Sequence, residues 1–204
     1  MVSKRSVANL SIASLLALAA RFGAGEQKPF QPGAAARYAH QASENVTVGA
    51  KSFDNPELAA NAFGKKTDFA KYGVLPVLVV IENKRDQTLD LRHLEVTLVA
   101  SDGRHAAAVA PDDLPFLATA GKYPSQNPVH VGLPVPLPKK KNPLNTPEIS
   151  ARAFSAKMLP AGDSASGFFY FEAKPERDDK LYVSGLLDAR SGQELLYFEF
   201  PLVD

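Results

Sequence analysis

The most constraining feature of the sequence is the stretch at residues 73–83 (GVLPVLVVIEN), in which residues 74–81 form an unbroken apolar run. Its β-branched residues are Val74, Val77, Val79, Val80 and Ile81. Such side chains favour a strand over a short helix, because their χ1 rotamers are restricted in a helix. Successive strand residues point to opposite faces, so an unbroken run predicts a strand that is covered on both faces. Pro76 cannot donate to a ladder and is predicted at a bulge or at a locally unpaired start.

Length and composition predict one domain with attachments. The chain has 204 residues, of which 45% are hydrophobic, and this is enough to bury one core. Its net charge of +1 creates no overall field that would attract nucleic acid, so we expect no nucleic-acid partner. Cysteine is absent, which excludes disulfides, thiolate zinc sites and a cysteine nucleophile. The lipobox cysteine is absent as well, so the sequence predicts that the protein is not a lipoprotein.

The N-terminus predicts a secretory signal peptide at residues 1–19. Two basic residues precede an apolar stretch at residues 7–20, and Ala17 and Ala19 match the small residues of a cleavage site. The apolar stretch is shorter than the ~20 residues that a spanning helix needs. We therefore expect an exported protein, periplasmic or extracellular, with no stable membrane span after cleavage.

A flexible tether is predicted at residues 20–43, where glycine, proline, glutamine and alanine follow no sustained period. Residues 44–204 are assigned to a single domain. Near its start, Asn55 and Pro56 predict the beginning of a short helix, and Gly64 predicts its end.

Downstream of the central run, the pattern changes to short strands separated by turn residues. Apolar and polar residues alternate from 89 to 98, and the turn at residues 101–104 predicts a hairpin that returns at residues 105–110, with His105 opposite Ala100. The remaining predicted strands are at residues 167–173, 181–187 and 195–202, and in the last of them Leu196, Phe198, Phe200 and Leu202 are predicted to share a face. Because strands and helices do not alternate regularly, the sequence predicts an antiparallel sandwich.

A long proline-rich excursion is predicted at residues 111–147, which hold nine of the sixteen prolines. Proline has a fixed φ and lacks an amide proton, so this segment is expected to run extended over the surface. After it, residues 147–158 fit a short helix that begins near Thr146, with a strand as the alternative.

Two segments resemble the turns and strands of a known family. Residues 79–91 and 96–104 resemble the early hairpins of immunoglobulin-like domains in exported bacterial proteins, and residues 159–171 resemble their later proline-glycine turn and strand. The resemblance implies an extracytoplasmic β-sandwich and supplies no catalytic residue. The expected fold class is mainly β: an antiparallel immunoglobulin-like sandwich with one or two short helices and a long proline-rich loop.

Patterns for catalysis and metal binding are weak. Ser164 and the pair Asp90 and His93 partly match a serine hydrolase, but their order along the chain is reversed relative to such esterases. The four histidines are His40, His93, His105 and His130. In the predicted hairpin, His93 would lie about 23 Å from the residue opposite His105, at ~3.3 Å per residue. This distance is too long for His93 and His105 to bind the same metal ion. The sequence predicts no catalytic residue, no cofactor and no metal ligand.

The proline-rich excursion is the predicted place of partner binding. Its prolines hold the backbone extended before binding, which lowers the entropy cost of association. Apolar anchors and an adjacent cationic run form the predicted set: Tyr123, Val131, Leu133, Val135, Leu137, Lys139, Lys140 and Lys141. The alternative is a loop that covers a sheet edge and prevents aggregation.

The expected function is an exported, non-enzymatic domain that binds or scaffolds a protein partner at the bacterial cell envelope. One alternative is a ligand-binding or carbohydrate-binding sandwich with Tyr123, Tyr170 and Tyr182 as the candidate aromatics, although the sequence favours core or rim packing for Tyr170 and Tyr182. Another is a hydrolase with an unrecognised site. The oligomeric state is left open.

Overall fold

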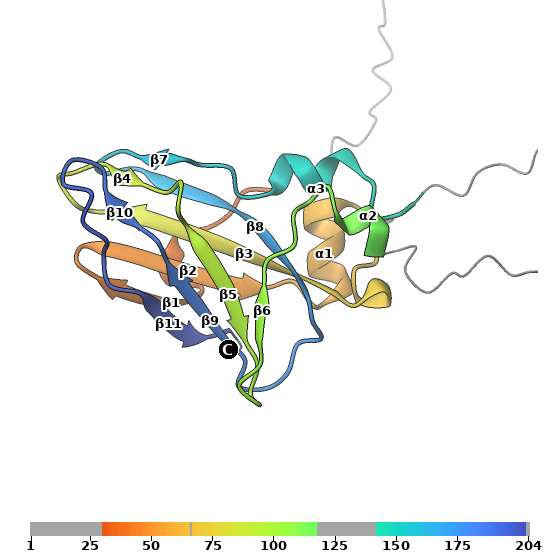
Figure 1. The fold of residues 1–204 in the computed structure, drawn as a ribbon. Helices are drawn as coiled ribbons and strands as arrows, with labels where there is room; N and C mark the ends of the chain where they lie inside the picture. The colour runs from red at the N-terminus through yellow and green to blue at the C-terminus, as the bar shows by residue number, and fades with distance from the viewer. Residues whose placement is uncertain (1–29, 66, 118–141, 203–204) are drawn as a thin grey trace, which may run out of the picture.

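The computed structural model describes residues 30–65, 67–117 and 142–202 (Figure 1). The first half of the chain contains two 3₁₀ turns, one helix and six strands: η1 (Ala35–Arg37), β1 (Ala39–Ser43), β2 (Val46–Ser52), α1 (Pro56–Phe63), η2 (Ala70–Tyr72), β3 (Val74–Asn83), β4 (Leu89–Asp90), β5 (Glu95–Val99) and β6 (His105–Ala107). The second half contains α2 (Leu114–Leu117), α3 (Pro147–Arg152), β7 (Met158–Leu159), β8 (Ser164–Glu172), β9 (Lys180–Ser184), β10 (Leu187–Asp188) and β11 (Phe198–Pro201).

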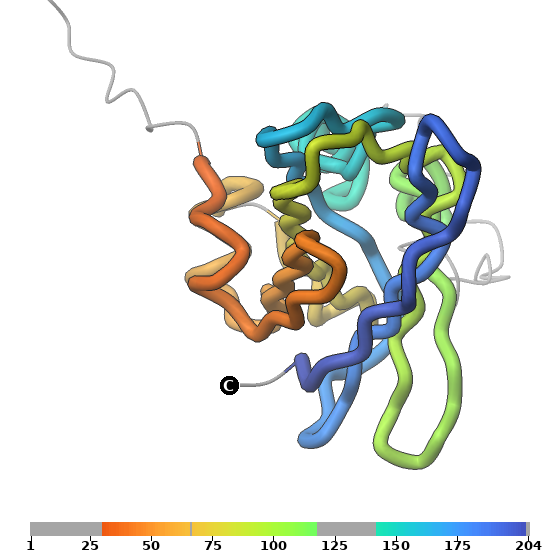
Figure 2. Tube along the Cα trace, turned by 90° about the vertical axis from the view of Figure 1, so that its left-hand side faces the viewer, coloured from red at the N-terminus to blue at the C-terminus, as the bar shows by residue number. Residues whose placement is uncertain are grey.

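The strands form two four-stranded antiparallel sheets that pack face to face. The first sheet has the order β1-β2-β3-β8 and the second has the order β11-β9-β5-β6. A small sheet, β10-β4-β7, lies at one end. In Figure 2, the orange and yellow strands of the first sheet lie beside the green and blue strands of the second. The prediction of a mainly β, antiparallel sandwich is confirmed.

Strand β3 is the centre of the fold, as the apolar run predicts. It pairs with β2 on one side and with β8 on the other, so that Val79 lies between Ala50 and Gly167. All of its residues except the half-buried Glu82 are buried. Alternate side chains enter different cores: Val79 packs between the two sheets, whereas Val80 packs on the opposite face. This double burial explains why the run has no polar alternation.

A layer of short helices covers the outer face of the first sheet. Phe63 of α1, Leu114 of α2 and Ile149 of α3 are buried there against Phe168 and other aromatic residues. Figure 1 shows the three helices together at one side of the sandwich. The sequence predicts short helices but not that they form this layer.

Local signals place helix α1 correctly. Glu57 N–H donates to Asn55 Oδ1 at 2.8 Å, and Gly64 ends the helix with φ +86°.

Residues 147–158 contain both predicted alternatives, a helix followed by a short strand. Helix α3 occupies Pro147–Arg152 and buries Ile149, and the short strand β7 follows.

The predicted tether is wrong where the structure describes it. Strand β1 pairs with β2 along its whole length, and Ala35 in η1 is fully buried. The backbone of Ala35 lies so close to that of Gly49 that a Cβ at Gly49 would be 2.3 Å from the carbonyl oxygen of Ala35. The pairing of β1 with β2 is local, through a two-residue turn in which Glu44 and Asn45 both have positive φ, and the composition of the segment did not reveal this hairpin. The distant contact is that of Ala35, whose N–H donates to Glu82 Oε1 at 2.8 Å. The predicted signal peptide, residues 1–19, lies outside the described residues.

Two details of strand pairing also differ from the predictions. Pro76 sits in a continuous ladder opposite Tyr170, and no bulge occurs there. Its missing amide points toward the end of β2, where Phe53 N–H donates to Pro76 O at 2.8 Å without a reciprocal bond. In the β5–β6 hairpin, His105 pairs with Val99 rather than with Ala100. Gly103, with φ +82°, makes the turn one residue tighter than predicted.

The described ends of the proline-rich excursion belong to the packed domain, which corrects the prediction of an entirely superficial loop. Leu114 and Leu144 are both buried in the core beneath the helices. Asn142 Nδ2 donates to Pro115 O at 2.7 Å and joins the two ends. Residues 118–141 lie outside the described residues.

Replacing residues 118–141 with a flexible linker is expected to leave the domain folded, because the contact between Asn142 and Pro115 remains. A deletion that extends to Asn145 should instead cost about 2–5 kcal/mol, because it removes Leu144 from the core. Urea denaturation of both variants measures the difference. Equal destabilisation by the two deletions would show that residues 118–141 are themselves part of the core.

Candidate functional site

The predicted partner-binding residues cannot be placed in the fold. Tyr123, Val131, Leu133, Val135, Leu137, Lys139, Lys140 and Lys141 all lie outside the described residues. The candidate site described below comes from residues that this prediction did not include.

Tyr170, a candidate aromatic for carbohydrate binding, is a core residue. It is fully buried, and its hydroxyl donates to Ile149 O at 2.8 Å. Burial raises the pKa of Tyr170 well above its ordinary value. This side chain joins the helical layer to β8 and cannot stack on a ligand, so Tyr170 has the packing role that the sequence favours and not the binding role.

The outer face of the second sheet is open in the described fold. Alternation along the strands directs Leu98, Leu181, Val183 and Phe198 into the core between the sheets. None of the residues that point outward is buried: Glu95, Thr97, Val99, His105, Ala107, Lys180, Tyr182, Ser184, Glu199 and Pro201. The two sheets therefore differ, since helices cover the outer face of the first and the described chain leaves that of the second exposed.

A stacked tyrosine pair lies on this open face. The rings of Tyr182 and Tyr197 have centroids 5.0 Å apart and an interplanar angle of 28°. Tyr197 is 52% exposed, and the preceding residue, Leu196, is 64% exposed. The sequence predicts Leu196 on the same buried face as Phe198. That is wrong, because β11 begins only at Phe198 and Leu195 is the buried residue before it.

Charged side chains flank the tyrosine pair. Lys180 Nζ and Glu199 Oε1 form an ion pair at 2.8 Å across β9 and β11. The hydrogen bond to Glu199 raises the pKa of Lys180. Both side chains are largely exposed, so the pair adds little to stability. It places one positive and one negative group beside the aromatic surface.

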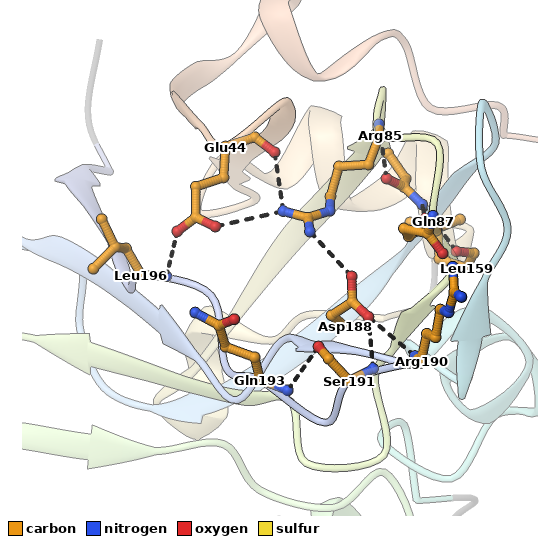
Figure 3. Close-up of polar contacts among 10 residues, drawn as sticks. Glu44, Arg85, Gln87, Leu159, Asp188, Arg190, Ser191, Gln193 and Leu196 are labelled. Atoms are coloured by element: carbon orange, nitrogen blue, oxygen red, sulfur yellow. Dashed lines mark hydrogen bonds and ion pairs between the residues drawn. The ribbon is translucent and has the colours of Figure 1, made fainter.

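A partly exposed polar network holds the chain at Leu196, the residue before Tyr197 (Figure 3). Arg85 contacts Glu44 at 3.4 Å and Asp188 at 3.1 Å. The other carboxylate oxygen of Glu44 accepts from Leu196 N–H at 3.1 Å. The network therefore joins the β1–β2 turn, the β3–β4 turn and the connection from β10 to β11.

Asp188 in this network is held in its charged form. The backbone N–H of Ser191 lowers the pKa of Asp188 most strongly, and the N–H of Arg190 and the guanidinium of Arg85 lower it further. Its carboxylate also closes the turn after β10 through these backbone donors. This arrangement fixes the start of the segment that leads to Tyr197.

The residues that partly match a hydrolase have other contacts. Arg92 Nε donates to both carboxylate oxygens of Asp90 at 3.0 Å, and this hydrogen bonding lowers the pKa of Asp90 to about 2. His93 lines an open hollow of about 380 Å³ with Glu95 and Glu194. Within residues 30–65, 67–117 and 142–202, no three His, Asp or Glu side chains come together as a metal site.

Comparison with known proteins adds little about function. No family model matches the sequence, and no curated protein matches it. A crystal structure of a Bacillus subtilis subsp. subtilis str. 168 protein named "putative lipoprotein (ycdA)" is similar, with a TM-score of 0.40 and 12% identity. The similar region covers 82% of this chain and 39% of that one, so the chain spans well under half of that protein. The immunoglobulin-like family stays a prediction.

The predicted location is corrected. The sequence predicts an exported protein, periplasmic or extracellular, that is not a lipoprotein, whereas the similar structure belongs to a protein named as a lipoprotein. We therefore do not retain the exclusion of a lipoprotein, which rested on the absence of cysteine from these 204 residues. In the part of the chain that the structure describes, every helix is too short or too polar to cross a membrane.

Proposed function

We propose that this chain is a non-enzymatic domain that binds a protein partner on the outer face of the β11-β9-β5-β6 sheet. The observation that supports this most directly is the stacked pair Tyr182 and Tyr197, which lies on an uncovered sheet face. Tyrosine is enriched where interfaces gain most of their binding energy, because it buries a large apolar area and keeps a polar tip.

The surroundings of the pair favour a protein over a small molecule. Small-molecule sites are concave and enclose most of their ligand, whereas Tyr182 and Tyr197 project from a sheet surface. The ion pair of Lys180 and Glu199 lies beside them and resembles the charged rim of a protein interface. The face thus combines an aromatic centre with polar surroundings.

A carbohydrate is the second candidate for the same face. Tyr197 is 52% exposed and could offer one ring face to a sugar. The stacked arrangement leaves less room for this, because each ring already covers one face of the other. A protein partner therefore remains the preferred proposal.

Photo-crosslinking tests the proposal. The crosslinking residue p-benzoylphenylalanine replaces Tyr197 in one variant and Asn61, which is exposed on α1, in the control. We expect an adduct with one particular protein from position 197 and not from position 61. Adding Tyr182→Ser should lower the adduct yield about tenfold or more, since losing an aromatic anchor costs on the order of 2 kcal/mol.

Two results would contradict a protein partner on this face. One is the same set of adducts from positions 197 and 61, or no adduct from position 197. The other is glycan-array binding that disappears in the Tyr197→Ala variant, which would assign the face to a carbohydrate.

A further inference from the structure

A gap lies between β6 and β8, which are edge strands of the two sheets. Strands β6 and β8 lie on the same side of the sandwich and meet at one bridge, where Val109 N–H donates to Tyr170 O at 2.7 Å. If antiparallel pairing continued from this bridge, Ala107 would pair with Glu172, but β6 and β8 form no ladder at these residues. The hairpin between β5 and β6 and the loop after β8 form the two separate loops at the bottom of Figure 2.

The gap contains a cavity of about 470 Å³. Leu98 and Ala106, which point toward the sandwich interior, line one wall, and Ala173 lines another. The cavity thus connects the open edge with the apolar interior. The small side chains of Ala106 and Ala173 leave room for another side chain between the sheets.

The backbone along one side of the gap has free hydrogen-bonding groups. Arg104 O accepts from Ala100 N–H of the neighbouring chain segment, and Val109 N–H points the other way, toward β8. Backbone direction alternates along a strand, so the N–H and C=O groups of His105 and Ala107 also point toward the gap. No described residue pairs with them. The gap therefore has the edge that an added strand requires.

The charge around the cavity is mainly negative. Asp179 lines it, is 1% exposed, and has one carboxylate oxygen, Oδ1, without a hydrogen-bond partner among the described residues. Glu172 and Glu176 also line the cavity. Of the two cationic side chains there, Arg104 is bound to Asp102 at 2.6 Å and also interacts through its charge with Glu176 and Asp179, and Lys174 is exposed. A buried carboxylate oxygen that lacks a donor favours a cationic group nearby.

We propose that this gap binds an extended peptide segment of a partner protein as an added strand along β6, with a lysine or arginine side chain directed toward Asp179. The free backbone groups recognise the strand, and the cavity with its carboxylate selects the side chain. Three residues of β6 span about 10 Å at ~3.3 Å per residue, which suits a segment of about three to five residues. This site is separate from the tyrosine face and does not depend on it.

Binding of a set of labelled peptides to the full chain in solution tests the proposal. The probes are fluorescein-labelled, seven-residue peptides with Thr, Val or Ser flanks and Lys, Arg, Glu or Ser at the centre, and fluorescence anisotropy measures binding. We expect the best Lys or Arg probe to bind at least about tenfold tighter than its Glu counterpart, a factor that corresponds to about 1.4 kcal/mol. Hydrogen exchange of the His105 and Ala107 amides should slow when that probe is bound.

Three variants distinguish the contribution of backbone pairing along β6 from that of the Asp179 charge. Ala107→Pro removes an amide that points into the gap and does not pair with β5, so it should weaken the best probe about tenfold while the domain stays folded. Asp179→Asn should abolish the preference for Lys over Glu. Asp178→Asn, at the adjacent exposed position with φ +74°, is the matched control and should keep that preference.

Three outcomes would overturn the proposal. They are no saturable binding of any probe, charge-dependent binding that leaves exchange at His105 and Ala107 unchanged, and equal effects of Asp178→Asn and Asp179→Asn. The Tyr182→Ser variant should bind the probes as the parent does. Its failure to do so would place the peptide on the tyrosine face and overturn the assignment to the gap.

Discussion

Replacing Val79 with aspartate is expected to unfold the domain at room temperature. Val79 is fully buried at the centre of β3, between Ala50 and Gly167. Its side chain packs in the core between the two sheets, where apolar residues surround it. An unpaired buried carboxylate costs several kcal/mol, against a total stability of ~5–15 kcal/mol. Circular dichroism with thermal melting should show no cooperative transition, or one that is lowered by tens of degrees.

Ser166→Asp is the matched control for this experiment. Ser166 lies in β8 of the same sheet, one register position away, opposite Val80, and its side chain is exposed. A charge there stays in water, so the change should alter the free energy of unfolding by less than about 1 kcal/mol. If Val79→Asp melts like Ser166→Asp, the centre of β3 is not buried and the proposed arrangement of the two sheets is wrong.

The second large effect is expected for Asn83→Asp, a change that keeps the shape of the side chain. Asn83 is 1% exposed, and its Nδ2 donates to Gln87 O at 2.8 Å, Leu159 O at 3.1 Å and Pro160 O at 3.0 Å. Aspartate removes these donors and turns a negative group toward three carbonyl oxygens. We expect a loss of about 3–5 kcal/mol, because each unsatisfied buried group costs about 1–3 kcal/mol.

Chemical denaturation with urea measures this loss, and Asn55→Asp is its control. Asn55 caps α1 by accepting from Glu57 N–H, and aspartate caps a helix equally well. The control should therefore stay within about 0.5 kcal/mol of the parent. An Asn83→Asp variant as stable as this control would show that the side-chain donors of Asn83 do not hold the turns together.

The two sides of the sandwich have different roles in these proposals. Helices close the outer face of the first sheet, so its side chains stabilise the domain. The outer face of the second sheet and the gap beside β6 expose groups that add little to folding: the ring of Tyr197, the ion pair of Lys180 and Glu199, and the free backbone of His105. Substitutions at these exposed groups should therefore change binding more than stability.

Local patterns in the sequence determined those parts of the fold that depend on neighbouring residues. The run at β3 predicts burial on both faces, because β-branched apolar residues occupy both sides of a strand there. Asn55 and Gly64 predict the bounds of α1 through capping, and Gly103 predicts the turn between β5 and β6 through its positive φ. In each case the deciding interaction lies within a few residues.

Only the tertiary structure decided the features that join distant segments. The segment before β1 resembles a tether in composition and is held in the fold because Ala35 N–H donates to Glu82 Oε1, 47 residues away. The stacking of Tyr182 and Tyr197 depends on the pairing of β9 with β11, and the gap at β6 depends on where β8 diverges from it. Composition and periodicity report the face that a residue prefers. They do not report which segment lies opposite, because that depends on packing energies summed over the whole chain.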